Sequence, residues 1–199
     1  MAEQGDILAQ ILDDHTWFRR QFLRLDELRA DDAAPAELAA VWTPLAARLD
    51  VHAAAEEQVF YPELLRRGAD DPAAETLDAI GDHNDIRDGV RDARAANVGD
   101  DAWWAGVRAA REANDEHMAE EEREGIADFR VHAPPRLRRS LGERFAAFLA
   151  EHRTSDELDT ADVDPDEYVA EVEAEIETER QDDLADAGSL RIGSLKGQR

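Results

Sequence analysis

The chain has 199 residues, with 48 acidic side chains against 23 basic ones, and its net charge is −25 at neutral pH. This length allows one domain to bury a core, and the absence of cysteine excludes disulfides, thiolate nucleophiles, iron–sulfur clusters and thiolate zinc sites. Because a surface with this excess of negative charge repels phosphate groups, we expect no nucleic-acid partner.

Hydrophobic periodicity predicts four helices in the first two thirds of the chain. Apolar side chains recur at three- and four-residue steps over residues 7–25, 38–60, 77–90 and 103–121. This spacing is typical of helices that each bury one face. No alternation of apolar and polar residues is long enough to predict a strand. Four helices joined by short turns imply an all-α, up-down-up-down four-helix bundle over residues 1–132.

Prolines and glycines mark the expected ends of these helices. Gly68 predicts the end of the second helix, Pro72 the start of the third, and Asn97–Asp100 a turn before the fourth. Two prolines also interrupt the second pattern, where proline removes a backbone hydrogen bond. Pro44 predicts a kink or a later helix start, and Pro62 predicts an end or a bend just before it.

The C-terminal part of the chain has a different composition. Residues 133–152 predict a short accessory helix, basic at its start and apolar further on. Residues 153–199 form an acidic tail, since positions 150–199 hold 16 acids and 5 bases, a difference of −11. A helix over 164–180 is compatible with this composition, but the low apolar content predicts a tail that is largely disordered.

The N-terminus shows no basic leader followed by a long apolar run, which would mark a secretory signal. No apolar stretch approaches the length needed to cross a bilayer. We therefore expect a cytoplasmic protein without a membrane partner, and the sequence leaves the oligomeric state open.

A small set of histidines and glutamates occurs twice, in the same order and at nearly constant spacing. Each copy has a lone histidine on one helix, and the next helix carries a histidine followed four residues later by a glutamate. The surroundings of both lone histidines read Asp-His-x-x-apolar-Arg, which indicates duplication of a two-helix unit. The six positions are His15, His52, Glu56, His83, His117 and Glu121.

The repetition favours a metal site over ordinary core packing. A single histidine on an apolar face is usually a hydrogen-bonded core residue. Residues four apart share a helix face, however, so both His-x-x-x-Glu pairs face the core. Burial of two ionised glutamates is costly without a cation, and Arg19 and Arg87 are expected at the edge of the apolar stripe. The neighbouring glutamates expected to face solvent are Glu57, Glu120 and Glu122.

The types of donor restrict the metal. Imidazole and carboxylate without sulfur suit iron, manganese or zinc. Two equivalent sets, with two carboxylates able to bridge, favour a pair of ions over one tetrahedral zinc. The Glu-x-x-His pattern of ferritin-like di-iron bundles and the His-Glu-x-x-His pattern of zincins are absent.

At these residues the chain resembles the hemerythrin-like (HHE cation-binding) domain family. The resemblance covers about residues 5–130 and includes Phe60-Tyr61-Pro62 after the first His-x-x-x-Glu. It implies a non-haem centre of two iron ions with an oxo or hydroxo bridge, with manganese and zinc ranked behind iron. It further implies Glu56 and Glu121 as bridging ligands. For Tyr61 itself, amphipathic packing at a helix end is favoured, and the alternatives are a hydrogen-bond donor behind the ligands or a ligand. The terminal ligands implied are His15, His52, His83 and His117.

One position departs from the oxygen-carrying members of this family. They have an additional ligand histidine four residues after the third-helix histidine, and here that position is Arg87. The departure disfavours plain oxygen carriage and favours binding of, or reaction with, a small oxidant such as dioxygen, hydrogen peroxide or nitric oxide. The alternative is an iron- or oxygen-responsive regulatory or iron-handling protein without turnover. The sequence does not decide whether the protein is a peroxide-decomposing or nitric-oxide-related oxidoreductase or no enzyme at all.

Overall fold

The computed structural model describes residues 5–155 and 158–192, and over these ranges the chain is helical, without a strand. The expected all-α class is confirmed. The four helices predicted from periodicity are all present, with longer bounds than the apolar patterns indicated. They are α1 (Ile7–Ala30), α2 (Pro35–Val59), α4 (Pro72–Ala95) and α5 (Asp101–Arg123).

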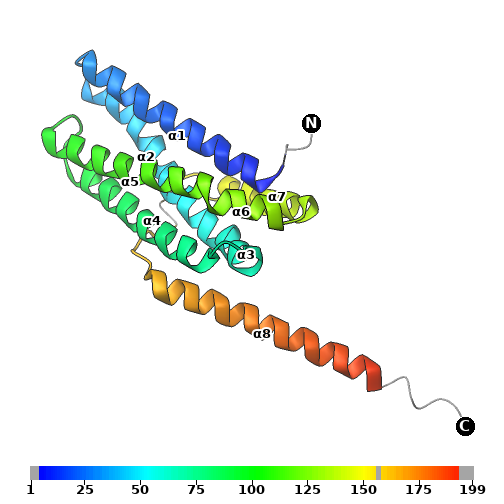
Figure 1. Cartoon of the computed structure of the whole chain (residues 1–199). Coiled ribbons are helices and arrows are strands. Elements are labelled where there is room, and N and C mark those ends of the chain that lie inside the picture. The colour runs from blue at the N-terminus through cyan, green and yellow to red at the C-terminus, as the bar shows by residue number, and fades with distance from the viewer. Residues whose placement is uncertain (1–4, 156–157, 193–199) are drawn as a thin grey trace, which may run out of the picture.

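These four helices form a closed ring of contacts. Helix α1 packs on α2, α2 on α4, α4 on α5, and α5 on α1. They lie side by side in Figure 1, with the turn between α1 and α2 at the same end as the turn between α4 and α5. Each helix therefore presents one face to a shared interior, which is where amphipathic helices bury their apolar stripe.

The helix ends follow the punctuation of the sequence in most places. Helix α3 (Tyr61–Arg67) directly follows α2, so the expected end near Pro62 is confirmed, as are an end at Gly68 and a start at Pro72. At Pro44 the expected late start was wrong, because α2 begins at Pro35 and continues through Pro44. Proline can remain inside a helix when the surrounding packing offsets the lost hydrogen bond.

Two hydrophobic clusters fill the ring, and the candidate ligands lie between them. On α1, Ile11 belongs to the cluster near α3, α6 and α7, while Phe18 belongs to the cluster near the interhelical turns. His15 stands between these two residues, one turn from each. The same order occurs on α4, where His83 lies between Ile80 and Ile86. The protein thus has a polar layer across the middle of its core.

Helices α4 and α5 approach each other most closely. A Cβ atom at Gly89 would overlap the backbone of Ala110, and one at Gly106 would overlap the backbone of Ala93. Only glycine permits this separation, because any side chain would push the two helices apart. The close contact joins the two helices that carry the second copy of the repeated histidines.

Helices α6 (Gly125–His132) and α7 (Pro135–Glu151) close one end of the ring. The accessory helix expected over 133–152 is confirmed, and it packs against α1 and α2. Leu141 and Phe145 of α7 are almost fully buried, and each such side chain contributes about 1.5–3 kcal/mol of hydrophobic free energy.

The acidic tail differs from the expectation of disorder. Helix α8 (Pro165–Ile192) begins where Asp164-Pro165 suggested and continues well beyond residue 180. Its first turns pack on α3 and α4 and bury Val169 and Val172, whereas Leu184 is 70% exposed. The expected disorder is therefore not seen over Pro165–Ile192, and at the first turns α3 and α4 supply the apolar contacts that the composition of the tail lacks. Figure 1 shows α8 extending past the other helices towards the C-terminus.

Part of the predicted tail, residues 156–157 and 193–199, lies outside the described residues. Among the described helices, none combines the length and the apolar character that crossing a membrane requires.

Candidate metal centre

The structure brings all six sequence-predicted residues into one buried layer. Helices α1 and α4 each contribute one histidine, and α2 and α5 each contribute a histidine and a glutamate one turn apart. None of the six is more than 4% exposed. They are His15, His52, Glu56, His83, His117 and Glu121.

The Nε2 atoms of the histidines face the two carboxylates. The Oε1 atom of Glu56 lies 2.9 Å from Nε2 of His52, and its Oε2 atom lies 3.4 Å from Nε2 of His83. On the other side, Oε2 of Glu121 lies 3.3 Å from Nε2 of His15. Ligand atoms of His15, Glu56, His117 and Glu121 all lie within 4.8 Å of one another. Such convergence of nitrogen and oxygen donors can hold a metal ion.

The donor atoms themselves support this interpretation. Among the described residues, no hydrogen-bond partner is found for Nε2 of His15 and His52, for either oxygen of Glu56, or for Oε2 of Glu121. His52 and Glu56 are close, but their 2.9 Å contact lacks the alignment of a hydrogen bond. Buried polar atoms without partners cost about 1–3 kcal/mol each, more when charged. A cation at the centre would satisfy all five atoms, so the residues fit a metal.

The buried layer also contains charged imidazole and carboxylate groups that shift one another's pKa values. Burial opposes protonation of His52, but the charge of Glu56 and the contact with Asp14 raise its pKa from 6.5 to about 10. Burial likewise opposes protonation of His117, and the neighbouring carboxylates again raise its pKa to about 10. For Glu56, burial is outweighed by the facing histidines, which hold its pKa well below 4.5. Protons on the histidines therefore neutralise the carboxylates, and an entering metal has to displace them.

The outer nitrogen of each histidine meets a carboxylate as well. His15 Nδ1 lies 3.0 Å from Glu122, and His83 Nδ1 lies 2.8 Å from Glu57. Each of these glutamates directly follows a candidate ligand glutamate on a different helix. Such contacts set the ring orientation and the tautomer of metal-binding histidines.

The histidines of α2 and α5 use aspartates from the first helix of their own repeat. His52 Nδ1 lies 2.9 Å from Asp14, and His117 Nδ1 lies 3.7 Å from Asp82. Asp14 is also bound by Arg48 at 2.8 Å. The outer layer therefore repeats the two-fold pattern of the inner one, with one looser contact at Asp82.

Three sequence expectations about this outer layer were wrong. Glu57 and Glu122 contact candidate ligand histidines instead of facing solvent. Arg87 is 2% exposed instead of lying at the edge of the apolar stripe. Arg87 Nη2 donates to Glu57 at 2.7 Å, and Arg19 pairs with Glu122 at 2.9 Å in the other half. The third neighbour, Glu120, is partly exposed as expected.

A signal for these contacts was present in the sequence. Both copies read Asp-His-x-x-x-Arg on the first helix and His-x-x-x-Glu-Glu on the second. The repeated second glutamate and the repeated arginine mark residues that the duplication preserved together with the ligands.

Tyr61, the first residue of α3, contacts one of the two candidate ligand glutamates. Its hydroxyl is fully buried and donates to Glu121 Oε1 at 3.1 Å. Burial, reinforced by the charges of Glu121 and Glu56, raises its pKa well above the ordinary value of 10.0, so the phenol keeps its proton. The equivalent position in the second copy, five residues after the glutamate, is Ile126. This contact is therefore one of the features in which the two halves differ.

His132 and His152, which lie outside the repeat, take no part in the layer. His132 pairs with Asp128 at 2.6 Å, and the ring of His152 packs against Phe148.

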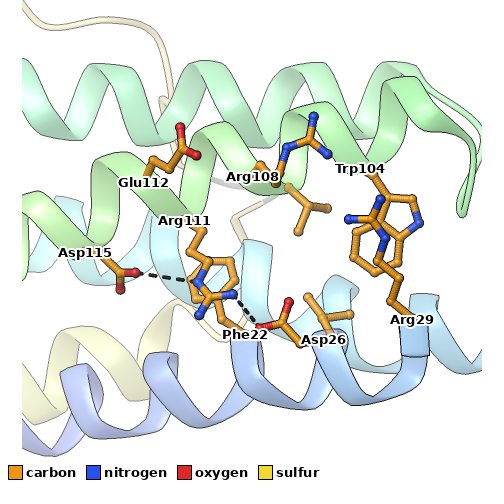
Figure 2. Close-up of a pocket in the computed structure, with 10 residues that line it drawn as sticks. Phe22, Asp26, Arg29, Trp104, Arg108, Arg111, Glu112 and Asp115 are labelled. Atoms are coloured by element: carbon orange, nitrogen blue, oxygen red, sulfur yellow. Dashed lines mark hydrogen bonds and ion pairs between the residues drawn. The ribbon is translucent and has the colours of Figure 1, made fainter. Parts of the chain in front are cut away.

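A groove of about 260 Å³ lies between α1 and α5, and it is separate from this layer (Figure 2). Four of its charged side chains contact one another or an aromatic ring: Asp26, Arg29, Arg111 and Asp115. Arg111 binds Asp26 at 2.7 Å, and the guanidinium of Arg29 stacks 4.7 Å from the centre of the Trp104 ring. None of the six candidate ligands lines it.

Comparison with known protein families gives one match. The family described as hemerythrin HHE cation binding domain matches residues 6–127, more than half of the chain. Comparison with curated proteins and with solved structures yields no match.

Proposed function

The chain belongs to the hemerythrin HHE cation-binding domain family, and from this premise we propose that it holds two iron ions in a hemerythrin-like four-helix bundle. We propose further that the pair binds or reacts with a small oxidant: dioxygen, hydrogen peroxide or nitric oxide. The observation that carries the proposal is the set of buried carboxylate and imidazole atoms that lack hydrogen-bond partners in the described structure.

The arrangement of side chains supports the proposed ligand roles. The rings of His15 and His52 lie 5.4 Å apart, and those of His83 and His117 lie 4.6 Å apart. Each pair would serve one ion, with the two glutamates between them. When bound, two iron ions supply redox chemistry and coordination positions for a small oxidant.

Arg87 occupies the position of the additional histidine, so the proposed centre has six protein ligands. Its guanidinium bonds to Glu57 at 2.7 Å and approaches Asn84 at 3.4 Å, in the outer layer. This side chain therefore does not replace the additional histidine of oxygen-carrying relatives as a ligand. The smaller ligand set supports reaction with an oxidant over plain oxygen carriage.

Burial restricts what can reach the centre. Because the six side chains are at most 4% exposed, a large substrate has no direct contact with them, whereas a two- or four-atom oxidant needs little space. Tyr61 holds a proton beside Glu121 Oε1, so the chain itself keeps one hydrogen-bond donor at the edge of the centre.

A second candidate is a regulatory or iron-handling protein without turnover. It is favoured by a contact of helix α8 with Glu57, the residue that meets Nδ1 of His83. The hydroxyl of Tyr168 on α8 donates to the backbone carbonyl oxygen of Glu57. Such a protein would bind iron without consuming peroxide or nitric oxide.

The test begins with protein purified without a histidine tag. We expect about two iron ions per chain and charge-transfer absorption that azide or peroxide changes. The double variant His52→Ala with Glu121→Ala should lose the metal, whereas the control His132→Ala should retain it. The proposal fails if the folded wild-type protein binds no iron. If two iron ions bind but neither azide nor peroxide changes the absorption spectrum, the result favours the regulatory or iron-handling protein.

A further inference from the structure

The C-terminal segment, here residues 155 and 158–172, attaches to the outer side of the His83 half of the polar layer. Asn84, the residue after His83, holds this segment by two hydrogen bonds with the backbone of Val163. Its Nδ2 donates to the carbonyl oxygen at 2.8 Å, and its Oδ1 accepts from the backbone N–H at 2.9 Å. This bidentate contact fixes the register of the segment on α4.

The same segment also holds Glu57. The hydroxyl of Tyr168 donates to the carbonyl oxygen of Glu57, while the carboxylate of Glu57 meets His83 Nδ1 at 2.8 Å and Arg87 at 2.7 Å. Val169 and Val172 anchor the helix nearby with 7% and 8% exposure. One residue therefore links α8 to a candidate metal ligand.

Further along α4, two arginines continue this attachment. Arg91 donates to the carbonyl oxygen of Thr160 at 3.0 Å and to Asp162 at 2.7 Å, and Arg94 donates to Ser155 at 3.0 Å. Residues 84, 87, 91 and 94 follow one another at helical spacing, so they form a single stripe on α4. The C-terminal segment is bound by three members of this stripe, although the side chains of Arg91 and Arg94 remain 40% and 43% exposed.

The equivalent stripe on α1 is open. With the offset of 68 residues, Arg19 corresponds to Arg87 and Leu23 corresponds to Arg91. The side chain of Arg19 is 44% exposed against 2% for Arg87, and Leu23 is 55% exposed. The duplication alone would make both halves alike, and the docked segment is one feature in which they differ.

We propose that residues 158–172 are a positioning clamp for the His83 half of the centre. The clamp holds Glu57 and the α4 backbone so that the His83 ring is already oriented for metal, and it thereby raises the affinity of that half. Because coupling between two binding events is reciprocal, metal bound at His83 also stabilises the docking of the segment. This inference rests on the proposed metal-binding function and adds a route by which metal occupancy reaches α8.

The test uses the full chain and two variants that each remove one attachment. Tyr168→Phe deletes a single hydroxyl and keeps the ring, and Asn84→Ala releases Val163. The control is Asn97→Ala, which removes a comparable side-chain hydrogen bond to Asp100 at 3.0 Å in the turn before α5. Circular dichroism verifies that every variant keeps its helices.

Two measurements are made with Fe²⁺ alone as the probe, under anaerobic conditions. Competition with a chelator should show one of the two Fe²⁺ equivalents weakened at least about fivefold in both variants and unchanged in the control. Amide hydrogen exchange over residues 163–172 should slow at least about fivefold when the wild-type protein is loaded with Fe²⁺.

Failure of this inference is distinguishable from failure of the proposed function. If two Fe²⁺ ions bind with the same affinities in all chains, and exchange over 163–172 ignores loading, the clamp is overturned and the metal centre stands. If neither the wild-type protein nor any variant binds Fe²⁺, the proposed function and the clamp are both overturned.

Discussion

Raising the pH should destabilise the metal-free protein, because its buried histidines act as internal counter-ions. The pKa of His52 rises from 6.5 to about 10 on folding, as Glu56 and Asp14 outweigh the cost of burial. A raised pKa contributes stability that is fully present below pH 6.5 and is lost as the pH approaches 10. Above that range the imidazoles are neutral, and Glu56 loses the cationic partners that offset its burial.

The magnitude follows from the size of the shift. At about 1.4 kcal/mol for each tenfold change in proton affinity, the rise from 6.5 to about 10 corresponds to at most about 5 kcal/mol. His117 shows the same shift, but Glu56 contributes to both, so the two values largely describe one interaction. A loss of a few kcal/mol is large against the 5–15 kcal/mol by which domains are usually stable.

The assay is urea unfolding in the presence of a chelator at several values between pH 6 and pH 10. The wild-type free energy of unfolding should fall across this range, while His52→Gln should show a flatter profile. His132→Gln, outside the centre, should behave as wild type. A wild-type profile that stays level or rises between pH 7 and pH 10 would refute the account of His52 as a counter-ion to Glu56.

Further predictions concern single contacts around the centre. Glu57→Ala removes the partner of a candidate ligand histidine and should weaken metal binding about 10- to 100-fold in chelator competition. Tyr61→Phe leaves a buried carboxylate oxygen without its donor and should cost about 1–3 kcal/mol in urea unfolding of the metal-free protein. Burial and the nearby Glu124 raise the pKa of Glu75 to about 8, so Glu75→Gln should raise the thermal midpoint at pH 9 but not at pH 4. Gly89→Ala should cost about 1–3 kcal/mol, by urea unfolding, because its Cβ meets the backbone of α5.

Periodicity and spacing predicted the helices with few errors, and they predicted that the six candidate residues face inward. Residues four apart on a helix share a face wherever that helix is placed, so His52 and Glu56 had to point the same way. Gly68 and Pro72 were equally informative, because their backbone restrictions act within a few residues. At Pro44 only the late helix start was wrong, since α2 begins at Pro35 and continues through Pro44.

Contacts between helices were harder to predict. Arg87 is buried and bonded to Glu57 of another helix, and nothing in its own apolar stripe indicates that partner. The tail was misjudged for a related reason, since Val169 and Val172 are buried only because α3 and α4 supply the surface. Composition reports what a segment can bury by itself, and it does not include a neighbour's surface.

The sequence alone determined the helical class, the duplicated unit and the six inward residues of the candidate centre, because each depends on spacing along one helix. The tertiary structure decided which carboxylate meets which imidazole, and it placed the C-terminal segment over the His83 half only. These contacts depend on distances between separate helices, which the packing of the helices sets and spacing along one helix does not. The two halves therefore read alike along the chain and differ in the folded protein.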